Sequence, residues 1–509
     1  MLESRQALPD REKPGWQRHA ALLFLMFAGV LVTYFGVFTT SYGKADDVSY
    51  LRLAANPLRS EWVTFARNGR PLYFIIEPAL RCVGNIGDLR YLRLVSILGV
   101  AFLSWGLYGA FVSTGRLAAS SALMAVLVVL TVPFQVFVSW AVTFPYAYAC
   151  FLTFVAVQVA DRAYRQPGGP RRWVGAALGS LLTLSALMFH QSAGMFVWVF
   201  LAIHLFGRRE NENRPLSSIA WHLGVIFAAC ALEFVAIKIG AVAYGHSPRT
   251  QIELNLLEKG RWFLLTVLPR SLHFVYVKSV PSVWVAVSVG AIILVGLLRY
   301  FMITKRHWFG YCFLALAFIP LSYTPNLLAK ENWSSYRSQV ALISLLAVYA
   351  FFALEGIIAT AVRWLKMDRS VPRITTACLL PLVLLAALQA STNVNLRVAR
   401  PACLEFQLIR RYLIEADLDQ VKSIFLIQPG WSHIPVPPAV FEEFGVPTTC
   451  QPWGPEAVVY LLLREIAVGK TGLPFAQVGA EEMAKKDIQP PEGALVIDMR
   501  KLVLYRGTF

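Results

Sequence analysis

The chain has 509 residues, of which 57% are hydrophobic, and its formal net charge is +17. Soluble domains average about 45–50% apolar residues. Here the excess is arranged in long runs, so we expect an integral membrane protein rather than a soluble enzyme. A basic balance in a soluble protein would suggest a nucleic-acid partner. In this chain many Lys and Arg residues lie in short segments between apolar runs, where they orient membrane helices, and we predict no nucleic-acid partner.

Eleven apolar runs are candidates for membrane-spanning helices, each of which needs about 20 mostly apolar residues. The first run exceeds the apolar stretch of a secretory signal and lacks a small-residue cleavage site, so we interpret it as a retained helix. The sequence therefore predicts a mainly α-helical, polytopic membrane protein of about 11 transmembrane helices in a lipid bilayer. The runs are residues 20–40, 94–112, 117–132, 143–160, 173–189, 192–206, 219–244, 283–300, 308–323, 340–362 and 374–390.

The basic residues predict the orientation of these helices. An excess of positive charge marks the cytoplasmic side, and the first run is preceded by Arg5, Arg11, Lys13 and Arg18. The N-terminus is therefore expected in the cytoplasm. We expect residues 1–391 to form a transmembrane domain. Alternation of the helices gives this domain three external segments, residues 41–90, 245–282 and 324–339.

The first external segment combines acidic and basic side chains directly after an apolar helix. Asp46 and Asp47 are adjacent, Tyr50 follows, and a stretch NGRP further on contains Asn68 and Arg70. A positioned carboxylate can remove the proton of an attacking hydroxyl, and the planar Arg fork matches the geometry of phosphate. The simpler interpretation is a solvated loop whose charges only stay in water, and the sequence leaves it open.

Other polar residues on the predicted outer side are further candidates. Tyr336 and Arg337 stand at the mouth of an apolar run, where the alternative is a helix-entry arginine at the interface. His190 ends an apolar run and either faces a site or lies at the interface. Glu77 lies in a short apolar stretch that we interpret as an interfacial or re-entrant helix, because an unpaired charge in hydrocarbon is costly. His273 lies in the second external segment.

The residue order of the first external segment resembles the first external loop of GT-C glycosyltransferases, multi-pass enzymes that use polyprenyl-phosphate sugars as donors. The likeness is nearest to Gtr-type serotype-converting glucosyltransferases and more distant to protein O-mannosyltransferases and lipid A aminoarabinose transferases. It rests on Asp46, Asp47 and Tyr50, an arginine-rich stretch, and the NGRP stretch. It covers the remaining apolar runs only as a pattern. The pair Tyr336-Arg337 likewise resembles the lipid-phosphate arginine of several such enzymes.

The resemblance implies an inverting glycosyltransferase of a bacterial inner membrane. It would move a sugar from a polyprenyl-phosphate donor to a cell-envelope glycan or glycolipid, such as lipopolysaccharide in O-antigen modification, on the periplasmic face. Asp46 would be the base and Asp47 would support it, although the sequence does not decide between them. No cofactor is required, but the pair would suit Mg²⁺ or Mn²⁺. Arg70, Arg337 and Arg67 would hold the donor phosphate. Substrate contacts would come from Tyr50, Asn68, Glu77, His190, His273 and Tyr336.

Three other functions stay open at this point. A carrier or flippase for lipid-linked glycans would bind a similar lipid, but transporters often show internal repeats and broken helices with polar midplane residues, which this sequence does not show clearly. An envelope polysaccharide polymerase would join longer chains. A non-catalytic assembly partner would not need the carboxylates. The sequence reveals neither the sugar, the acceptor nor the oligomeric state.

After the last apolar run, residues 392–509 predict a small α/β domain on the periplasmic side. VKSIFLI and ALVIDM are typical of strands, and PEAVVYLLLREIAVG is typical of a helix. We expect this domain to cover the membrane active site or to receive the acceptor. It contains Cys403 and Cys450, for which we predict a disulfide because the periplasm permits oxidation.

Overall fold

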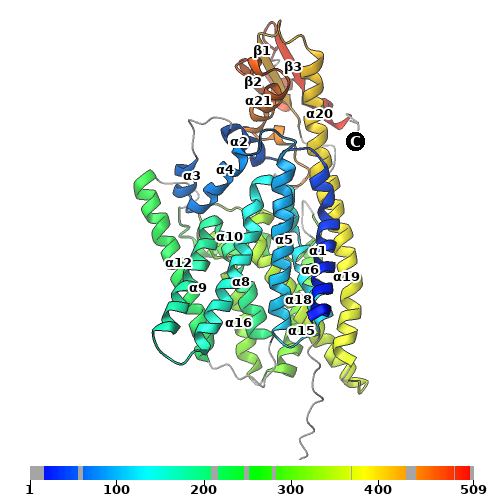
Figure 1. Cartoon of the computed structure of the whole chain (residues 1–509). Helices are drawn as coiled ribbons and strands as arrows, with labels where there is room; N and C mark the ends of the chain where they lie inside the picture. The colour runs from blue at the N-terminus through cyan, green and yellow to red at the C-terminus, as the bar shows by residue number, and fades with distance from the viewer. Residues whose placement is uncertain are drawn as a thin grey trace, which may run out of the picture.

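The computed structural model of the chain is a bundle of helices with a small sheet at one end, here called the sheet end (Figure 1). It describes residues 16–54, 61–207, 216–245, 251–277, 282–305, 307–367, 370–430, 443–486 and 488–504. Eight of the described helices are long and apolar enough to cross a membrane. They are α1 (Trp16–Thr39), α5 (Leu89–Val112), α8 (Phe144–Arg165), α9 (Pro170–Phe189), α12 (Leu216–Tyr244), α15 (Val283–Thr304), α18 (Val340–Trp364) and α19 (Val371–Val394).

The predicted mainly α-helical membrane fold is confirmed, but the count of eleven crossings is not. Three of the predicted runs form bent or shorter apolar helices. In the bent pair, α6 and α7 meet at 63°. Thr131 is extended there and Pro133 stands in the first turn of α7, where proline lacks the N–H that would continue the hydrogen-bond ladder of α6. The three are α6 (Ala118–Val129) with α7 (Val132–Ser139), α10 (Gln191–Gly194) with α11 (Val197–Phe206), and α16 (Trp308–Leu321).

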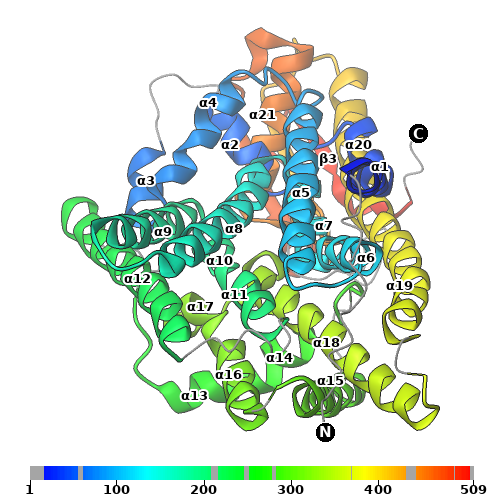
Figure 2. The same cartoon turned by 60° about the horizontal axis from the view of Figure 1, so that its bottom comes forward.

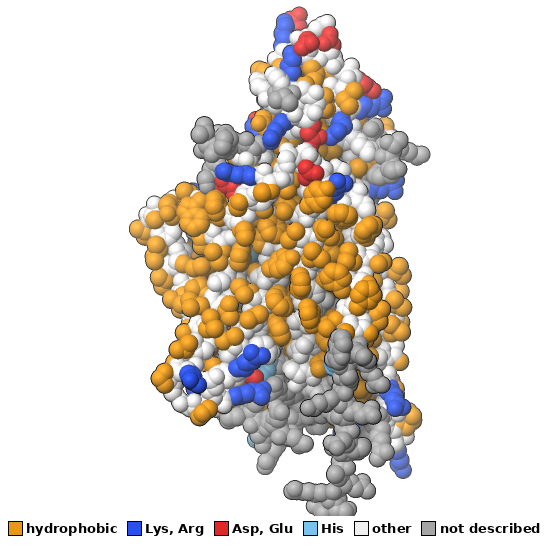
Figure 3. All heavy atoms as spheres, viewed as in Figure 1, with side chains coloured by type: hydrophobic (Ala, Val, Ile, Leu, Met, Phe, Trp, Pro, Cys, Tyr) orange, Lys and Arg blue, Asp and Glu red, His pale blue; other side chains and the backbone are white. Residues whose placement is uncertain are grey.

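The outer surface and the interior of the bundle both suit a membrane. Figure 3 shows a broad band of hydrophobic side chains across the middle of the face in view, with charged side chains gathered toward both ends. Among the eight long helices α18 is the most enclosed, with 78% of its apolar window buried. A Cβ at Gly356 would lie 2.4 Å from the carbonyl oxygen of Gly296. Glycine therefore permits the close packing of α18 on α15, as small residues do in membrane proteins.

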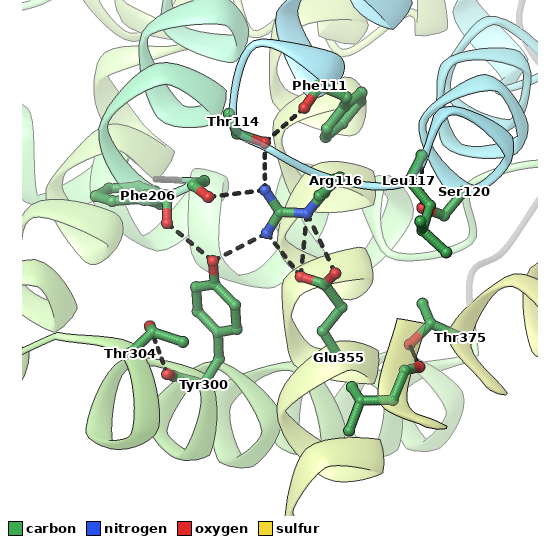
Figure 4. A network of polar contacts seen from close by, with 12 residues as sticks. Phe111, Thr114, Arg116, Leu117, Ser120, Phe206, Tyr300, Thr304, Glu355 and Thr375 are labelled. Atoms are coloured by element: carbon green, nitrogen blue, oxygen red, sulfur yellow. Dashed lines mark hydrogen bonds and ion pairs between the residues drawn. The ribbon is translucent and has the colours of Figure 1, made fainter. Parts of the chain in front are cut away.

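At the end of the bundle opposite the sheet, here called the far end, Arg116 ties several helices together (Figure 4). Its guanidinium pairs with Glu355 of α18 at 2.6 Å and donates to the hydroxyl groups of Thr114 and Tyr300 at 2.6 and 2.9 Å. It also donates to the carbonyl oxygen of Gly207 at 2.8 Å. The protein itself therefore supplies partners for all three nitrogens of this guanidinium, and the contacts join α5, α11, α15 and α18.

The three segments predicted to be external fold into short helices. An isolated antiparallel bridge between Ile252 and Ala329 joins the second segment to the third. The first contains α2 (Asp46–Ala54), α3 (Trp62–Arg67), η1 (Pro71–Ile75) and α4 (Ile76–Arg81). The second contains α13 (Leu256–Trp262), the π-helical turn η4 (Phe263–Val267) and α14 (Leu268–Ser271), and the third contains α17 (Thr324–Leu328) and η5 (Tyr336–Gln339).

The C-terminal part contains a three-stranded parallel sheet in the order β2-β1-β3. Both predicted strands and the predicted helix are confirmed. The remaining strand was not predicted, because its sequence FAQVG is short and only one of its residues is buried. The elements are β1 (Ser423–Gln428), α21 (Gly454–Ile466), β2 (Phe475–Gly479), α22 (Ala480–Lys486) and β3 (Ala494–Asp498).

A continuous helical rod joins the bundle to the sheet. Helix α19 continues through the π-helical turn η7 (Asn395–Ala399) into α20 (Arg400–Glu415). Figure 1 shows this rod along the side of the bundle, and Figure 2 places α19 and α12 at opposite edges. The predicted domain boundary between residues 391 and 392 therefore falls inside a helix. Continuous hydropathy stops there, but buried side chains still recur at helical spacing, as at Leu404 and Leu408.

The predicted disulfide between Cys403 and Cys450 is wrong, because both residues are free cysteines. The sulfur of Cys403 lies 3.5 Å from Nε2 of Gln407 on the same helix, whereas the sulfur of Cys450 lies 3.5 Å from the carbonyl oxygen of Pro429. A shared domain is thus not enough to bring two thiols together, since a disulfide also demands a narrow Cβ geometry.

Candidate active site

A cavity of about 230 Å³ opens among the segments that were predicted to be external. Its walls come from α2, the loop before η1, α12 and the segments on either side of the Ile252–Ala329 bridge. Of the eleven predicted site residues, six line it: Asp46, Tyr50, Asn68, Arg70, His190 and Arg337. The five that do not line it are Asp47, Arg67, Glu77, His273 and Tyr336.

Asp46 reaches the cavity from the first turn of α2. Ala45, just before it, has φ = 44°, a left-handed conformation that costs a residue with a side chain roughly 1–2 kcal/mol. The N–H of Ala45 donates to Oγ1 of Thr448 at 3.1 Å, which helps to hold this turn. The side chain of Asp46 is 31% exposed, and one carboxylate oxygen lies 3.2 Å from Nη1 of Arg337. The fold therefore brings together an acid and an arginine that are distant in sequence.

Asp47 is fully buried and serves a different purpose from its neighbour. Its two oxygens accept the backbone N–H groups of Lys44 at 3.0 Å and Val142 at 2.9 Å. Burial raises the pKa of Asp47 to about 6, although those N–H groups and the charge of Arg93 act in the opposite direction. The interpretation of a solvated loop is therefore wrong for Asp47, which anchors the Asp46 turn to the loop after α7.

The acidic pair does not fit a metal centre built from two carboxylates. Both oxygens of Asp47 already accept N–H groups, so of this pair Asp46 alone lines the cavity. Ions such as Mg²⁺ need a near-octahedral shell of oxygen ligands, and one carboxylate supplies a small part of it. The chemistry that follows therefore uses no metal at Asp46.

Arg337 is supported from both its side chain and its backbone. Its guanidinium lies over the ring of Trp140, 4.7 Å from the centroid, an arrangement that favours a cation. The backbone N–H groups of Tyr336 and Arg337 donate to the carboxylate of Glu443 at 2.7 and 2.9 Å. The side chain of Glu443 is fully buried and Tyr336 is 1% exposed. Tyr336 thus belongs to the support of Arg337 and not to the wall of the cavity.

Arg70 is positioned by Gln191, which the sequence did not single out. The Nε atom of Arg70 donates to Oε1 of Gln191 at 2.6 Å. The amide nitrogen of Gln191 lies 3.1 Å from the carbonyl oxygens of Asn68 and Gly69 and 3.2 Å from Oε1 of Glu233. Gly69 has φ = 71°, which glycine adopts at little cost. One glutamine therefore joins the NGRP turn, α10 and α12.

The remaining predicted residues divide between the cavity and the scaffold. The ring of His190 lies against Tyr146 with centroids 4.2 Å apart, and both residues line the cavity. Glu77 instead pairs with Arg81 at 2.5 Å. His273 lies 3.0 Å from a backbone carbonyl oxygen of its own turn. Glu77 also accepts the backbone N–H of Glu61 at 3.3 Å. Neither Glu77 nor His273 lines the cavity, so the cavity gives no support for their predicted substrate roles.

Lys238 is the clearest residue that sequence reasoning missed. It lies on α12 five positions after Glu233, a spacing that is poor for pairing along a helix, and it lines the cavity. Glu233 reaches the same site through Gln191. The signal was present, since ionisable residues within an apolar span are functional candidates. Other lining residues that were not predicted are Tyr73, Tyr146, Gln191, Asn326, Glu331 and Trp333.

Residues 443–449, here called the clamp segment, bring the C-terminal part of the chain to this site. Nζ of Lys44 donates to the carbonyl oxygen of Val446. Thr448 accepts the N–H that precedes Asp46, and its own N–H donates to Glu405 of α20 at 2.9 Å. The same segment begins with the glutamate that supports Arg337. The clamp segment therefore helps to hold both Asp46 and Arg337 in place.

The composition of the cavity suits an anionic ligand that carries a sugar-like polar part. Among the residues that the structure describes, three cationic side chains and two carboxylates line it. Arginine binds phosphate through paired, charge-assisted hydrogen bonds. The aromatic rings offer flat apolar surface with polar edges. The charged lining residues are Arg70, Lys238, Arg337, Asp46 and Glu331, and the aromatic residues with polar groups are Tyr50, Tyr73, Tyr146 and Trp333.

No protein-family model and no curated protein matches this chain. Among solved structures, it is similar to the crystal structure of an Archaeoglobus fulgidus oligosaccharyltransferase that is tethered with an acceptor peptide through a disulfide bond. The match covers 82% of this chain and 62% of that chain, with 13% sequence identity and a TM-score of 0.43. This chain thus spans less than two thirds of the length of that structure. A TM-score of this size does not establish a common fold, so the proposal that follows rests on the residues of the cavity.

Proposed function

We propose that this chain is a membrane glycosyltransferase of the GT-C kind, which moves a sugar from a polyprenyl-phosphate donor to a hydroxyl of an envelope glycan or glycolipid. One observation carries the proposal. Asp46 presents a carboxylate to a cavity that also holds Arg337, Arg70 and Lys238, among segments that connect the long apolar helices. The residue order around Asp46, which resembles the first external loop of those enzymes, supports the same function.

The lining residues can divide the steps of an inverting transfer among them. The acceptor oxygen attacks the anomeric carbon, and Asp46 accepts the hydroxyl proton as the new carbon–oxygen bond forms. The bond between the anomeric carbon and the phosphate oxygen breaks, and the phosphate leaves with the electron pair. Arg337, Arg70 and Lys238 are placed to stabilise the charge that develops on it. Before the donor binds, Arg337 is paired with Asp46.

The exposed apolar face of α12 supports a lipid-borne donor. Phe234 and Ile237 of α12 line the cavity. Val235, Ile239 and Val242 of the same helix are 51%, 63% and 87% exposed. Contiguous exposed apolar surface marks contact with a membrane or a partner, and α12 lies at the edge of the bundle (Figure 2). A lipid in the bilayer would therefore reach the cationic residues along this helix, with its phosphate at the membrane boundary.

The acceptor would approach from the sheet end, where the clamp segment lies against the Asp46 turn. We place the N-terminus in the cytoplasm and the sheet end in the periplasm of a bacterial inner membrane, from the basic residues that precede α1. A lipopolysaccharide or another envelope glycolipid would offer its hydroxyl groups on that side.

The test is sugar transfer by the purified full chain in detergent. Short-chain polyprenyl-phosphate hexoses with a labelled sugar would serve as donors, and a lipopolysaccharide-containing envelope fraction would serve as acceptor. Asp46→Asn keeps the shape of the side chain but removes the proton acceptor. Because general bases typically contribute 10²–10⁴-fold, transfer should fall by at least about 100-fold while the protein stays folded.

Asp419→Asn is the matched control, because Asp419 is 88% exposed in the C-terminal part. It should transfer sugar at the wild-type rate. If Asp46→Asn transfers sugar at the wild-type rate, Asp46 has no part in the mechanism. Binding of the labelled lipid without transfer to any acceptor would instead favour a carrier.

A further inference from the structure

Three ionisable side chains from three different helices meet near the far end of the bundle, away from the cavity. Asp161 lies near the end of α8, His204 near the end of α11, and His222 in the second turn of α12. All three residues are buried. Their candidate ligand atoms, one from each residue, lie within 4.8 Å of one another. The proposed glycosyltransferase chemistry uses none of them.

The hydrogen bonds of these three side chains are of the kind that hold metal ligands in place. Nε2 of His204 lies 3.0 Å from Oδ1 of Asp161, while Oδ2 of Asp161 pairs with Arg165 at 2.8 Å. Nδ1 of His222 lies 2.7 Å from the carbonyl oxygen of Ser218, so Nδ1 carries the proton that is donated. In the neutral ring Nε2 then holds the lone pair. Hydrogen bonds to the second ring nitrogen and to ligating carboxylates are the usual outer contacts of a metal site.

The donor set selects one class of ion. Two imidazole nitrogens and one carboxylate oxygen suit zinc and other first-row transition metals. Calcium and magnesium prefer oxygen ligands alone. With zinc bonds of about 2.0–2.2 Å, two ligand atoms of a tetrahedral site lie about 3.3–3.6 Å apart, so the 3.0 Å between Nε2 of His204 and Oδ1 of Asp161 would change little. The three ligand atoms lie within 4.8 Å of one another, so the ion would draw them closer together. The simpler alternative is a buried Asp–His hydrogen bond with a second histidine packed at a ring distance of 5.3 Å.

We propose that Asp161, His204 and His222 bind a divalent transition-metal ion, best matched by zinc, that cross-links α8, α11 and α12. The ion would stabilise the far end of α12, the helix that carries Lys238 and lines the cavity nearer its other end. Its role is therefore structural. A ligand that binds only the folded state stabilises it by an amount that grows with the logarithm of the free ligand concentration relative to its Kd.

Metal content measures this site directly. The full chain, purified without a polyhistidine tag, would be loaded with zinc chloride, dialysed against metal-free buffer and analysed by mass spectrometry. About one zinc per chain should remain. The double variant His204→Ala/His222→Ala should fall to background. The control variant His307→Ala should retain about as much zinc as wild type, because His307 is an exposed histidine in the turn between α15 and α16.

Two further readouts keep the proposal testable if the double variant folds poorly. Cobalt(II) bound to the wild-type protein should give the visible absorption bands of a low-coordinate nitrogen–oxygen site, and zinc added to metal-free wild type should raise its unfolding temperature. Stoichiometric zinc should also be lost from the milder variant His222→Gln. A wild-type chain that keeps no zinc and shows no cobalt bands would overturn the proposal, as would variants that keep wild-type zinc content. Neither result would affect the sugar-transfer function.

Discussion

Two arginine–carboxylate pairs in this protein have the same chemistry and different surroundings. Arg116 and Glu355 lie 2.6 Å apart at the far end, with side chains 9% and 20% exposed, and hydroxyl and carbonyl groups complete the contacts of the arginine. Arg337 and Asp46 lie 3.2 Å apart, with side chains 13% and 31% exposed, in the wall of the cavity. The protein encloses the first pair, whereas the second pair faces a space of about 230 Å³.

The difference separates an enclosed pair from one that a ligand in the cavity can reach. A buried pair whose hydrogen bonds are complete is costly to break, because the remaining charge has no solvent. A pair that faces a cavity can exchange its partner for a ligand. Asp47 is adjacent to Asp46, but its contacts are complete within the protein, like those of the Arg116–Glu355 pair. Position in sequence is thus a poor guide to which charges react, and the contacts of each carboxylate are a better one.

The largest effect on stability is expected at the far end. Glu355→Gln leaves Arg116, whose side chain is 9% exposed, without a counter-charge. Loss of one partner of a fully buried pair costs about 3–5 kcal/mol, which is an upper bound here because Glu355 is 20% exposed. The free energy of unfolding in detergent should fall by up to that amount, while turnover per folded molecule stays normal. Asp46→Asn should show the opposite behaviour, with lost turnover and little change in stability. Equal unfolding of wild type and Glu355→Gln would mean that the pair at the far end is not structural.

A pH effect is expected from Asp47. Its pKa is raised to about 6 in the folded protein, compared with about 3.9 for an ordinary aspartate. The folded state therefore holds the proton more tightly, and the stability from this group falls as pH rises from about 4 to 6, by up to about 3 kcal/mol. The free energy of unfolding, measured between pH 4.5 and 7.5, should fall with rising pH in wild type and should not show this fall in Asp47→Asn. Identical slopes in the two proteins would exclude the contribution.

A smaller effect is expected at Arg337. Charge-assisted contacts contribute about 1.5–3 kcal/mol each, so Arg337→Ala should raise the KM for the polyprenyl-phosphate donor at least about tenfold. Arg337→Lys should restore it in part, because a point charge cannot reproduce the fork. Arg410→Ala, at an exposed arginine paired with Glu465, is the control and should behave as wild type. If Arg337→Ala leaves the donor KM unchanged, Arg337 does not bind the donor phosphate and serves only as an anchor at the membrane interface.

The smallest effect is expected at Gln191, which orients Arg70 without carrying charge. Hydrogen bonds to charged groups contribute about 1.5–3 kcal/mol, but Gln191→Ala leaves Arg70 itself in place to hold the phosphate. The donor KM should therefore rise by less than in Arg337→Ala, by about fivefold or about 1 kcal/mol, and the acceptor KM should stay unchanged. Gln191→Glu keeps the acceptor oxygen for Arg70 but places a carboxylate 3.2 Å from Glu233, and it should be more harmful. If the alanine variant changed the acceptor KM instead, Gln191 would contact the acceptor.

The sequence predicted most of the helical fold and six of the residues that line the cavity. Long apolar runs are a local signal, and each of them lies on a helix. Asp46 and Arg337 were found because each borders such a run and because their order resembles a known loop. Both residues line the cavity, with Arg70, Tyr50 and His190.

The rest depended on contacts between residues that are distant in the sequence. The burial of Asp47 depends on the backbone of Val142, and the position of Arg337 depends on Glu443. No local pattern reports either contact. The failed disulfide has the same cause, since the direction of a side chain follows from packing. Lys238 was visible as a charge in an apolar helix, but only the fold shows which space it faces.

The clamp segment has a consequence for the way this protein matures. The chain is synthesised from its N-terminus, so the Asp46 turn and Arg337 emerge well before residues 443–449. Nζ of Lys44, the N–H of Ala45 and the backbone N–H of Arg337 gain their contacts with residues 443–449 only when that late segment arrives. A partly synthesised chain would therefore hold Asp46 and Arg337 without their final alignment. Under the proposed function, sugar transfer would require residues 443–449 to have folded onto the bundle.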